Sequence, residues 1–125
     1  MAHTNPVGWF EIYVQDMARA RKFYEVVFQT ELTRLDGTGD LEMFAFPMDP
    51  EKPGTAGALV RAPGVNSGGG GTLVYFSCDD CANEASRVAT AGGRVHREKL
   101  SIGQYGFIAL VVDSESNMIG LHSMK

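Results

Sequence analysis

The sequence has few of the features that would assign it at once to a broad class. Basic residues are sparse and scattered, with 11 Lys and Arg against 15 Asp and Glu, which argues against nucleic-acid binding. No apolar run approaches the ~20 residues that span a bilayer. The opening MAHTNPVGW has no basic region followed by an apolar block, so it does not resemble a signal peptide. We therefore expect a cytoplasmic protein that binds neither nucleic acid nor membrane.

Cysteine is also scarce. The two present, Cys78 and Cys81, form a single C-x-x-C, which can be redox-active or supply half of a zinc site. No second C-x-x-C and no H-x-x-x-H completes such a site. Cys78 falls on an apolar strand position and Cys81 in the first turn of an expected helix. The prediction is two reduced cysteines packed as small apolar side chains.

The sequence contains one pattern that occurs twice. WFEIYVQDMARARKFY begins at Trp9 and LVYFSCDDCANEASRV begins at Leu73. Each alternates with a period of two, reaches an Asp and then changes to helical spacing. Asp16 and Asp80 can accept hydrogen bonds from the first N–H groups of the helices that follow. Each copy therefore predicts a strand followed by a capped helix.

The remainder of each copy predicts extended segments. They are expected at 31–35, 41–46 and 56–61, with a turn at 36–40, and at 94–100, 105–112 and 118–123. Helical spacing places six side chains on the inner face of the first helix: Met17, Ala20, Phe23, Tyr24, Val27 and Phe28. Four others take its outer face: Arg19, Arg21, Lys22 and Glu25. The second helix is expected to run to Gly92 and Gly93.

These elements predict one α+β domain over residues 1–125. It consists of two tandem βαβββ units, 7–64 and 72–123, joined by the Gly-rich linker 65–71. Each unit would form a curved sheet with its helix on one face. Together the sheets would form a cup-shaped mixed sheet with the helices outside, and the cup would be the site of any chemistry. A symmetric homodimer is also expected, as the commonest oligomer.

Three stretches carry a family resemblance: FEIYVQDMARARKFYEVVF, DDCANEASRVATAGGRV and GFIALVVDSESNMIGLHS. They resemble the vicinal oxygen chelate superfamily, which includes glyoxalase I, bleomycin-resistance proteins and extradiol dioxygenases. The likeness covers about residues 7–123 and is closest to small proteins related to lactoylglutathione lyase. It implies the paired βαβββ fold. In the turn DSESN the family usually has Gly where Ser116 stands, so Ser116 would be strained if its φ is positive.

The resemblance also implies where a metal would bind. The four ligand positions of metal-dependent members fall on Trp9, Gly57, Leu73 and Gly120, and none of these side chains can ligate an ion. No divalent metal and no other cofactor is therefore expected. The two glycines are expected to enlarge the cup.

Strand alternation predicts the lining of the cup. We expect these side chains to line it and bind a ligand: Trp9, Glu11, Tyr13, Leu73, Tyr75, Ser77, Phe107 and His122. Gly57, Leu59 and Gly120 should face it as well. In an alternative, Trp9 and Leu73 fill the former metal site as core.

Glu11 is the most informative of these residues. A carboxylate inside an apolar strand is costly unless it is paired or functional, and burial would raise its pKa. Glu11 and His122 are therefore candidate catalytic acid and base groups. In the alternative, Glu11 faces water or pairs with a basic side chain.

Three functions follow from this lining. The first is a metal-free module that binds a planar or cationic small molecule in an aromatic cup, as bleomycin-resistance proteins do. The second is a lyase, isomerase or dioxygenase-like enzyme that uses Glu11 and His122, with or without a divalent metal. The third is an inert structural homolog whose cup is filled.

Overall fold

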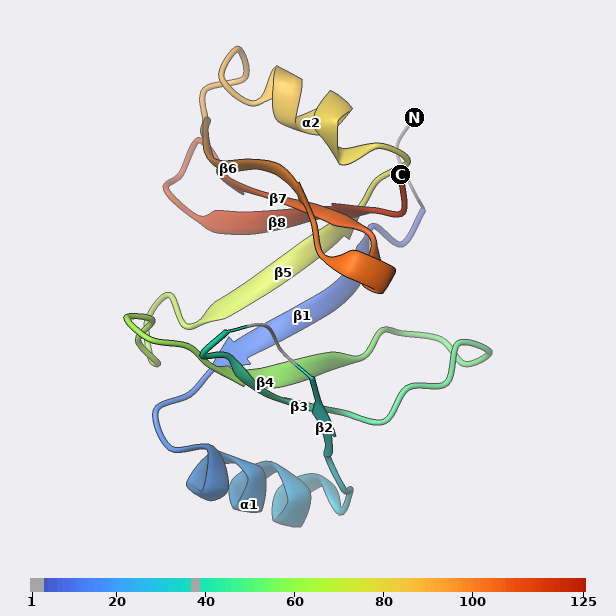
Figure 1. Ribbon diagram of the computed structural model, residues 1–125, viewed down its shortest axis with the longest axis vertical. Helices are drawn as coiled ribbons and strands as arrows, with labels where there is room; N and C mark the ends of the chain where they lie inside the picture. The colour runs from blue at the N-terminus through green and yellow to red at the C-terminus, as the bar shows by residue number, and fades with distance from the viewer. Residues whose placement is uncertain (1–3, 37–38) are drawn as a thin grey trace. The chain divides into compact units, whose positions relative to one another are not determined.

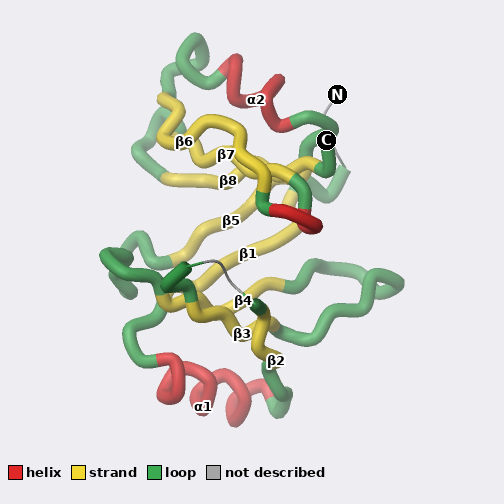
Figure 2. The backbone as a smooth tube through the Cα atoms, viewed as in Figure 1, coloured by secondary structure: helices red, strands yellow, loops and turns green. Residues whose placement is uncertain are grey.

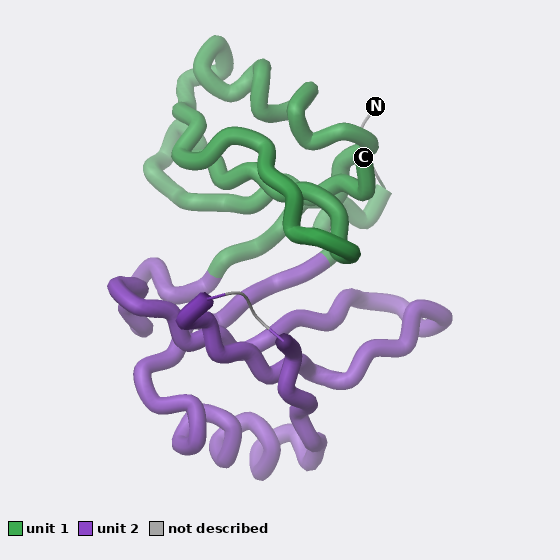
Figure 3. Tube along the Cα trace, viewed as in Figure 1, with its two compact units in different colours: residues 1–8, 73–125 green, residues 9–72 purple. Residues whose placement is uncertain are grey.

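The computed structural model describes residues 4–36 and 39–125, so positions 37 and 38 of the expected 36–40 turn lie outside the described residues (Figure 1). The chain forms two compact units (Figure 3). The N-terminal unit is Trp9–Thr72, and the C-terminal unit combines the residues up to Gly8 with Leu73–Lys125. In both units a strand is followed by a helix and then by three further strands (Figure 2). The predicted α+β fold of two βαβββ units is confirmed.

The N-terminal unit is a four-stranded mixed sheet with a helix on one face. Its elements are β1 (Val7–Tyr13), α1 (Met17–Phe28), β2 (Thr33–Leu35), β3 (Glu42–Ala45) and β4 (Gly57–Arg61). The strand order is β2–β3–β4–β1. β1 and β4 are parallel, whereas β3 pairs antiparallel with both β2 and β4. The first two residues of β1 belong to the C-terminal unit.

Helix α1 begins as the sequence predicts, because the Asp16 carboxylate accepts a hydrogen bond from the Arg19 N–H at 3.1 Å. Its buried stripe differs from the prediction. Met17 packs in a core with Val14, Leu32 and Leu59, whereas three apolar side chains expected inside are exposed: Phe23, Val27 and Phe28.

Arg21 and Glu25 were expected on the outer face of α1 but are partly buried. The Arg21 guanidinium lies 4.1 Å from the centre of the Phe44 ring and 3.2 Å from Glu25. Because it stacks on Phe44 and pairs with Glu25, the Arg21 side chain can cover apolar surface. The side of the helix that faces the sheet therefore includes Arg21.

The C-terminal unit repeats the arrangement. Its elements are β5 (Thr72–Ser77), α2 (Cys81–Arg87), β6 (Arg94–Ser101), the 3₁₀ turn η1 (Gly103–Tyr105), β7 (Phe107–Val112) and β8 (Met118–Ser123). The strand order is β5–β8–β7–β6, with β5 and β8 parallel. Thr72, the first residue of β5, belongs to the N-terminal unit. Buried Cys81, Ala85 and Leu121 form its core with neighbouring β7 side chains.

Helix α2 is shorter than predicted. It ends at Arg87, and the chain then turns through Gly92, whose φ is 100°. Turn hydrogen bonds between residues three apart, such as Ala91 N–H to Val88 O at 3.1 Å and Gly92 N–H to Ala89 O at 3.2 Å, follow the helix. The glycines therefore end the connecting turn and not the helix itself. Among the residues described, no helix is both long and apolar enough to cross a membrane.

Ser116 has a φ of 67°, so the strain expected of this turn is present. Replacing Ser116 by Gly is expected to raise the free energy of unfolding by roughly 1 kcal/mol, because Gly adopts positive φ without a Cβ clash. Urea denaturation measures the change. Ser114→Gly, in the same turn but without positive φ, serves as the control and should bring no gain. Equal effects of the two changes would contradict the strain.

Candidate functional site

Strand β1 presents two chemically different faces. Its helix-facing side chains are apolar: Ile12, like Val14 just after the strand, joins the core under α1, and the Phe10 ring lies 5.6 Å from that of Phe46. The alternate residues on the other face are Trp9, Glu11 and Tyr13. The alternation predicted for β1 is therefore confirmed. We call these last three residues the Glu11 cluster.

The Glu11 cluster is joined by hydrogen bonds. The Trp9 indole Nε1–H donates to Glu11 Oε2 at 3.3 Å, and the Tyr13 hydroxyl donates to Glu11 Oε1 at 2.6 Å. Both partners are two residues away on the same strand, so the pleat of β1 aligns them. A carboxylate has about four acceptor positions, so these two bonds leave others for a ligand.

The environment of Glu11 shifts its ionisation. Burial raises the pKa of Glu11 above its ordinary value of 4.5, and the hydrogen bonds from Tyr13 and Trp9 oppose part of that rise. In the alternative left open by the sequence, Glu11 would face water or pair with a cation. The structure gives it two neutral hydrogen-bond donors in a partly buried position that remains partly open to water.

This shift predicts a pH-dependent stability. The folded protein holds the Glu11 proton more tightly than the unfolded chain does, so the stabilisation is complete below pH 4.5. It is lost as pH rises through the raised pKa. Glu11→Gln should remove this part of the profile, so the variant becomes more stable relative to wild type as pH increases. Urea denaturation of both proteins at several pH values measures it, and a difference that does not vary with pH would contradict the shift.

The register of the N-terminal sheet corrects two expected positions. Gly57 pairs with Phe10, and Leu59 pairs with Ile12, so both lie on the helix side of the sheet and not beside Glu11. Leu59 is fully buried in the core under α1. Ala58 pairs with Glu11 and takes the place expected of Gly57. The methyl side chain of Ala58 offers no metal-donor atom.

Both glycines at the expected metal positions accommodate aromatic rings. A Cβ at Gly57 would meet the ring and the carbonyl of Phe10, and a Cβ at Gly120 would overlap the Tyr75 ring. Tyr75 pairs with Gly120 across β5 and β8. The expectation that these glycines enlarge a cavity is therefore wrong, because aromatic side chains occupy the space.

The C-terminal unit brings together a second group of the predicted residues. Leu73 and Tyr75 are buried on β5, and Ser77 pairs with His122 across β5 and β8. The His122 ring nitrogen Nε2 lies 2.6 Å from the Tyr105 carbonyl oxygen in η1. When Nε2 carries the proton, this bond fixes the ring and leaves Nδ1 as the acceptor.

Phe107 does not lie on the expected face. It packs against the core beneath α2, on the same side of β7 as the buried Ala109 and Val111. The Lys99 ammonium lies 4.7 Å from the centre of its ring. Alternation counted from Ala109 places Phe107 on the helix side, so the sequence signal was present but misassigned.

Glu11 and His122, the two predicted acid–base residues, belong to different units. The structure joins Trp9, Glu11 and Tyr13 through hydrogen bonds in one unit. In the other it aligns Ser77 with His122. Within residues 4–36 and 39–125, no three His, Cys, Asp or Glu side chains are grouped to hold a metal ion.

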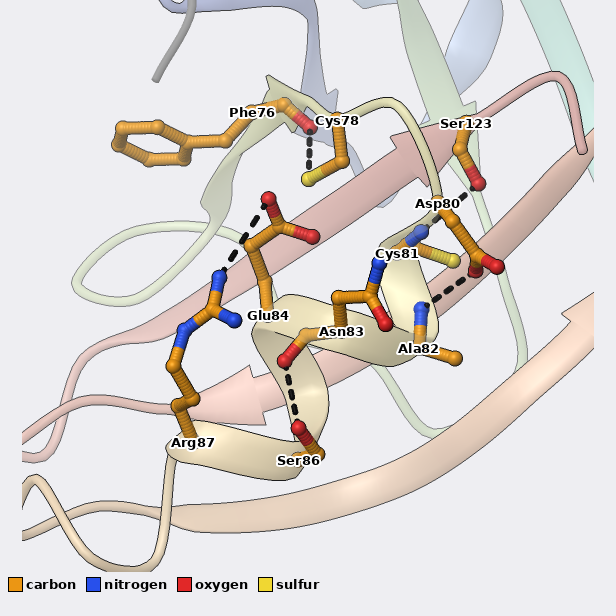
Figure 4. A network of polar contacts seen from close by, with 10 residues as sticks. All are labelled: Phe76, Cys78, Asp80, Cys81, Ala82, Asn83, Glu84, Ser86, Arg87 and Ser123. Carbon is orange, nitrogen blue, oxygen red and sulfur yellow. Dashed lines mark hydrogen bonds and ion pairs between the residues drawn. The ribbon is translucent and has the colours of Figure 1, made fainter. Parts of the chain in front are cut away.

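Cys78 directly follows β5 and Cys81 begins α2, and polar contacts lie around both (Figure 4). Asp80 accepts a hydrogen bond from Ala82 N–H at 3.0 Å, and Ser123 Oγ accepts one from Cys81 N–H at 3.0 Å. Both thiols are buried, which confirms that the cysteines pack as predicted. Burial, followed by the nearby Glu84 carboxylate, raises the pKa of the Cys78 thiol to about 11.

Because both cysteines are buried, they should be unreactive in the folded protein, and the raised pKa of Cys78 adds to this for that thiol. The Cys78 thiol is almost entirely protonated at neutral pH, and the thiolate is the nucleophile. We expect both thiols to react with Ellman's reagent at least tenfold more slowly in the native protein than in urea. Rapid native labelling of Cys78 would contradict its burial.

The comparisons with known proteins bear on the whole fold. The model of the Glyoxalase/Bleomycin resistance protein/Dioxygenase superfamily matches residues 6–108. The chain belongs to this superfamily. The resemblance drawn from the first strand, the capping Asp and the helix is thereby confirmed. No curated protein matches the chain.

Solved structures of the same fold include methylmalonyl-CoA epimerase from Mycobacterium tuberculosis. It is 14% identical with a TM-score of 0.71, and the match covers 99% of this chain and 91% of the epimerase chain. The Streptomyces coelicolor methylmalonyl-CoA epimerase in complex with 2-nitronate-propionyl-CoA is also 14% identical, with a TM-score of 0.66 and coverages of 94% and 96%. Protein BH1468 from Bacillus halodurans is 10% identical, with a TM-score of 0.71 and coverages of 95% and 94%. At these identities the likeness concerns the fold alone.

Proposed function

We propose that this superfamily member binds a planar, cationic small molecule at the Glu11 cluster, without a metal. The observation that supports this is the pair of bonds from Trp9 and Tyr13 to a partly buried Glu11. A carboxylate held between two aromatic side chains offers a charge and a stacking surface in one place. The net charge of −4 also favours a cation over an anion.

Ligands of matched shape and different charge test the proposal. Isothermal titration calorimetry would compare 1-naphthylmethylammonium, 1-naphthylmethanol and naphthalene-1-sulfonate against the protein at pH 8. The cation should bind most tightly, because Glu11 supplies a charge-assisted hydrogen bond. Equal affinities, or tighter binding of the sulfonate, would overturn the proposal.

A proton-transfer enzyme is the second candidate. The raised pKa of Glu11 supports it, because a general base works best when its pKa approaches the operating pH. Two of the similar structures are epimerases of methylmalonyl-CoA. Incubation with methylmalonyl-CoA in D₂O would reveal proton abstraction as deuterium at C2, detected by mass spectrometry. Exchange that survives Glu11→Gln would exclude Glu11 as the base.

A further inference from the structure

Helix α1 has a second apolar stripe that faces away from its own sheet. Residues spaced i, i+3, i+4, i+7 and i+8 follow one side of the helix: Arg19, Lys22, Phe23, Val26 and Val27. They line a shallow open hollow of about 300 Å³. Phe23 is 57% exposed, Val26 65% and Val27 54%. A helix with one side in water normally carries polar residues there, so this stripe calls for a partner.

The area of the stripe limits the kind of partner. Together with Phe28, which is 62% exposed, these side chains leave roughly 400 Å² of apolar surface uncovered. Two copies facing each other would bury about 800 Å², which is less than the roughly 1,200–2,000 Å² of a stable complex. A self-association through this stripe alone would be weak and would depend on protein concentration.

The charges on α1 favour a second copy. Arg19 lies in the first turn, where the helix dipole is positive and a cation is unfavourable. The first turn has no acidic residue, and the last turn has no basic residue. In an antiparallel pair centred near Phe23, each Arg19 would lie beside the last turn of the other helix, where the dipole is negative. The same stripe on two copies related by a twofold axis would therefore place each Arg19 beside a favourable helix end.

We propose that this α1 stripe is a self-association surface, which joins two copies of the chain through an antiparallel pair of α1 helices. Phe23 and Val26 form the apolar centre, and Arg19 stabilises the C-terminal end of the partner helix. This gives the expected homodimer a defined surface and is independent of any ligand at Glu11.

Sedimentation velocity over about 10 µM to 1 mM tests the proposal, since a weak dimer dissociates in that range. The wild-type sedimentation coefficient should rise with concentration. Val26→Glu should abolish the rise, because it places a charge at the centre. Met48→Glu is the matched control: Met48 is 69% exposed but lies in the loop before β4, so dimerisation should persist.

Arg19→Glu separates association from folding. It places an acid in the first turn, three residues after the Asp16 cap, which should stabilise the isolated helix. The same change should weaken the dimer at least threefold, because the stripe loses its match to the partner's C-terminal end. Circular dichroism confirms folding of each variant. A wild-type monomer at every concentration, unchanged association of both α1 variants, or equal weakening by Met48→Glu would overturn the proposal.

Discussion

Replacing Glu11 by Gln should weaken binding of 1-naphthylmethylammonium by roughly 10- to 100-fold. A hydrogen bond to a charged group contributes about 1.5–3 kcal/mol, and each 1.4 kcal/mol is a factor of ten in affinity. The amide keeps the shape of the side chain but removes the charge that the Trp9 and Tyr13 donors hold in place. Isothermal titration calorimetry at pH 8 measures the loss.

Two controls separate the effect of the Glu11 charge from that of the net charge of the protein. Glu31→Gln removes one charge from an exposed position after α1, so it should change the affinity less than twofold. Binding of 1-naphthylmethanol should change little in the Glu11 variant, because this ligand has no charge to lose. An equal loss with Glu31→Gln would mean that only the net charge of the protein matters.

Gly120→Ala should lower the free energy of unfolding by about 2–3 kcal/mol. The new Cβ would overlap the Tyr75 ring, and an aromatic ring in a packed sheet cannot move aside as a flexible chain end does. Gly69→Ala is the matched control, because a Cβ there meets nothing within 4 Å and should change stability little. Urea denaturation gives both values.

A double-mutant cycle assigns the cause of that loss. In a Tyr75→Ala background the ring is absent, so Gly120→Ala should cost at least 1 kcal/mol less than it does in wild type. A cost that stays the same without the ring would show that the backbone of β8, and not Tyr75, requires glycine at this position.

The repeat was readable because it combines local signals. The period-two strands and the capping residues Asp16 and Asp80 act within a few positions of themselves, so the sequence alone predicts each strand–helix pair. Cys78 and Cys81 were likewise placed correctly by their phase in the repeat. Neither prediction depends on contacts between distant segments.

The errors concern side chains whose place depends on a neighbour. Which face of β4 carries Gly57 follows from its register with β1, and the chain length between these strands does not fix that register. The spacing of α1 allows two apolar stripes, and the packing of Met17 and the contact of Arg21 with Phe44 show which one faces the sheet. Phe23 and Val27 were assigned to the wrong stripe for this reason.

The candidate site could be predicted only in part. Trp9, Glu11 and Tyr13 follow from alternation within one strand, but the hydrogen bonds that join them require coordinates. Phe107 was misplaced by one strand position. The bond of His122 to the Tyr105 carbonyl spans 17 residues and a 3₁₀ turn, which no local sequence pattern specifies.

The most direct measurement is the indole N–H resonance of Trp9, the one tryptophan of the chain, in ¹H–¹⁵N correlation spectra during titration with 1-naphthylmethylammonium at pH 8. Its proton is donated to Glu11, so any ligand that engages the carboxylate alters its chemical shift. We expect a saturable shift that follows the calorimetric affinity and requires at least tenfold more ligand in Glu11→Gln. A resonance that stays fixed while the ligand binds, with other residues shifting instead, would place the binding site elsewhere and contradict binding at the Glu11 cluster.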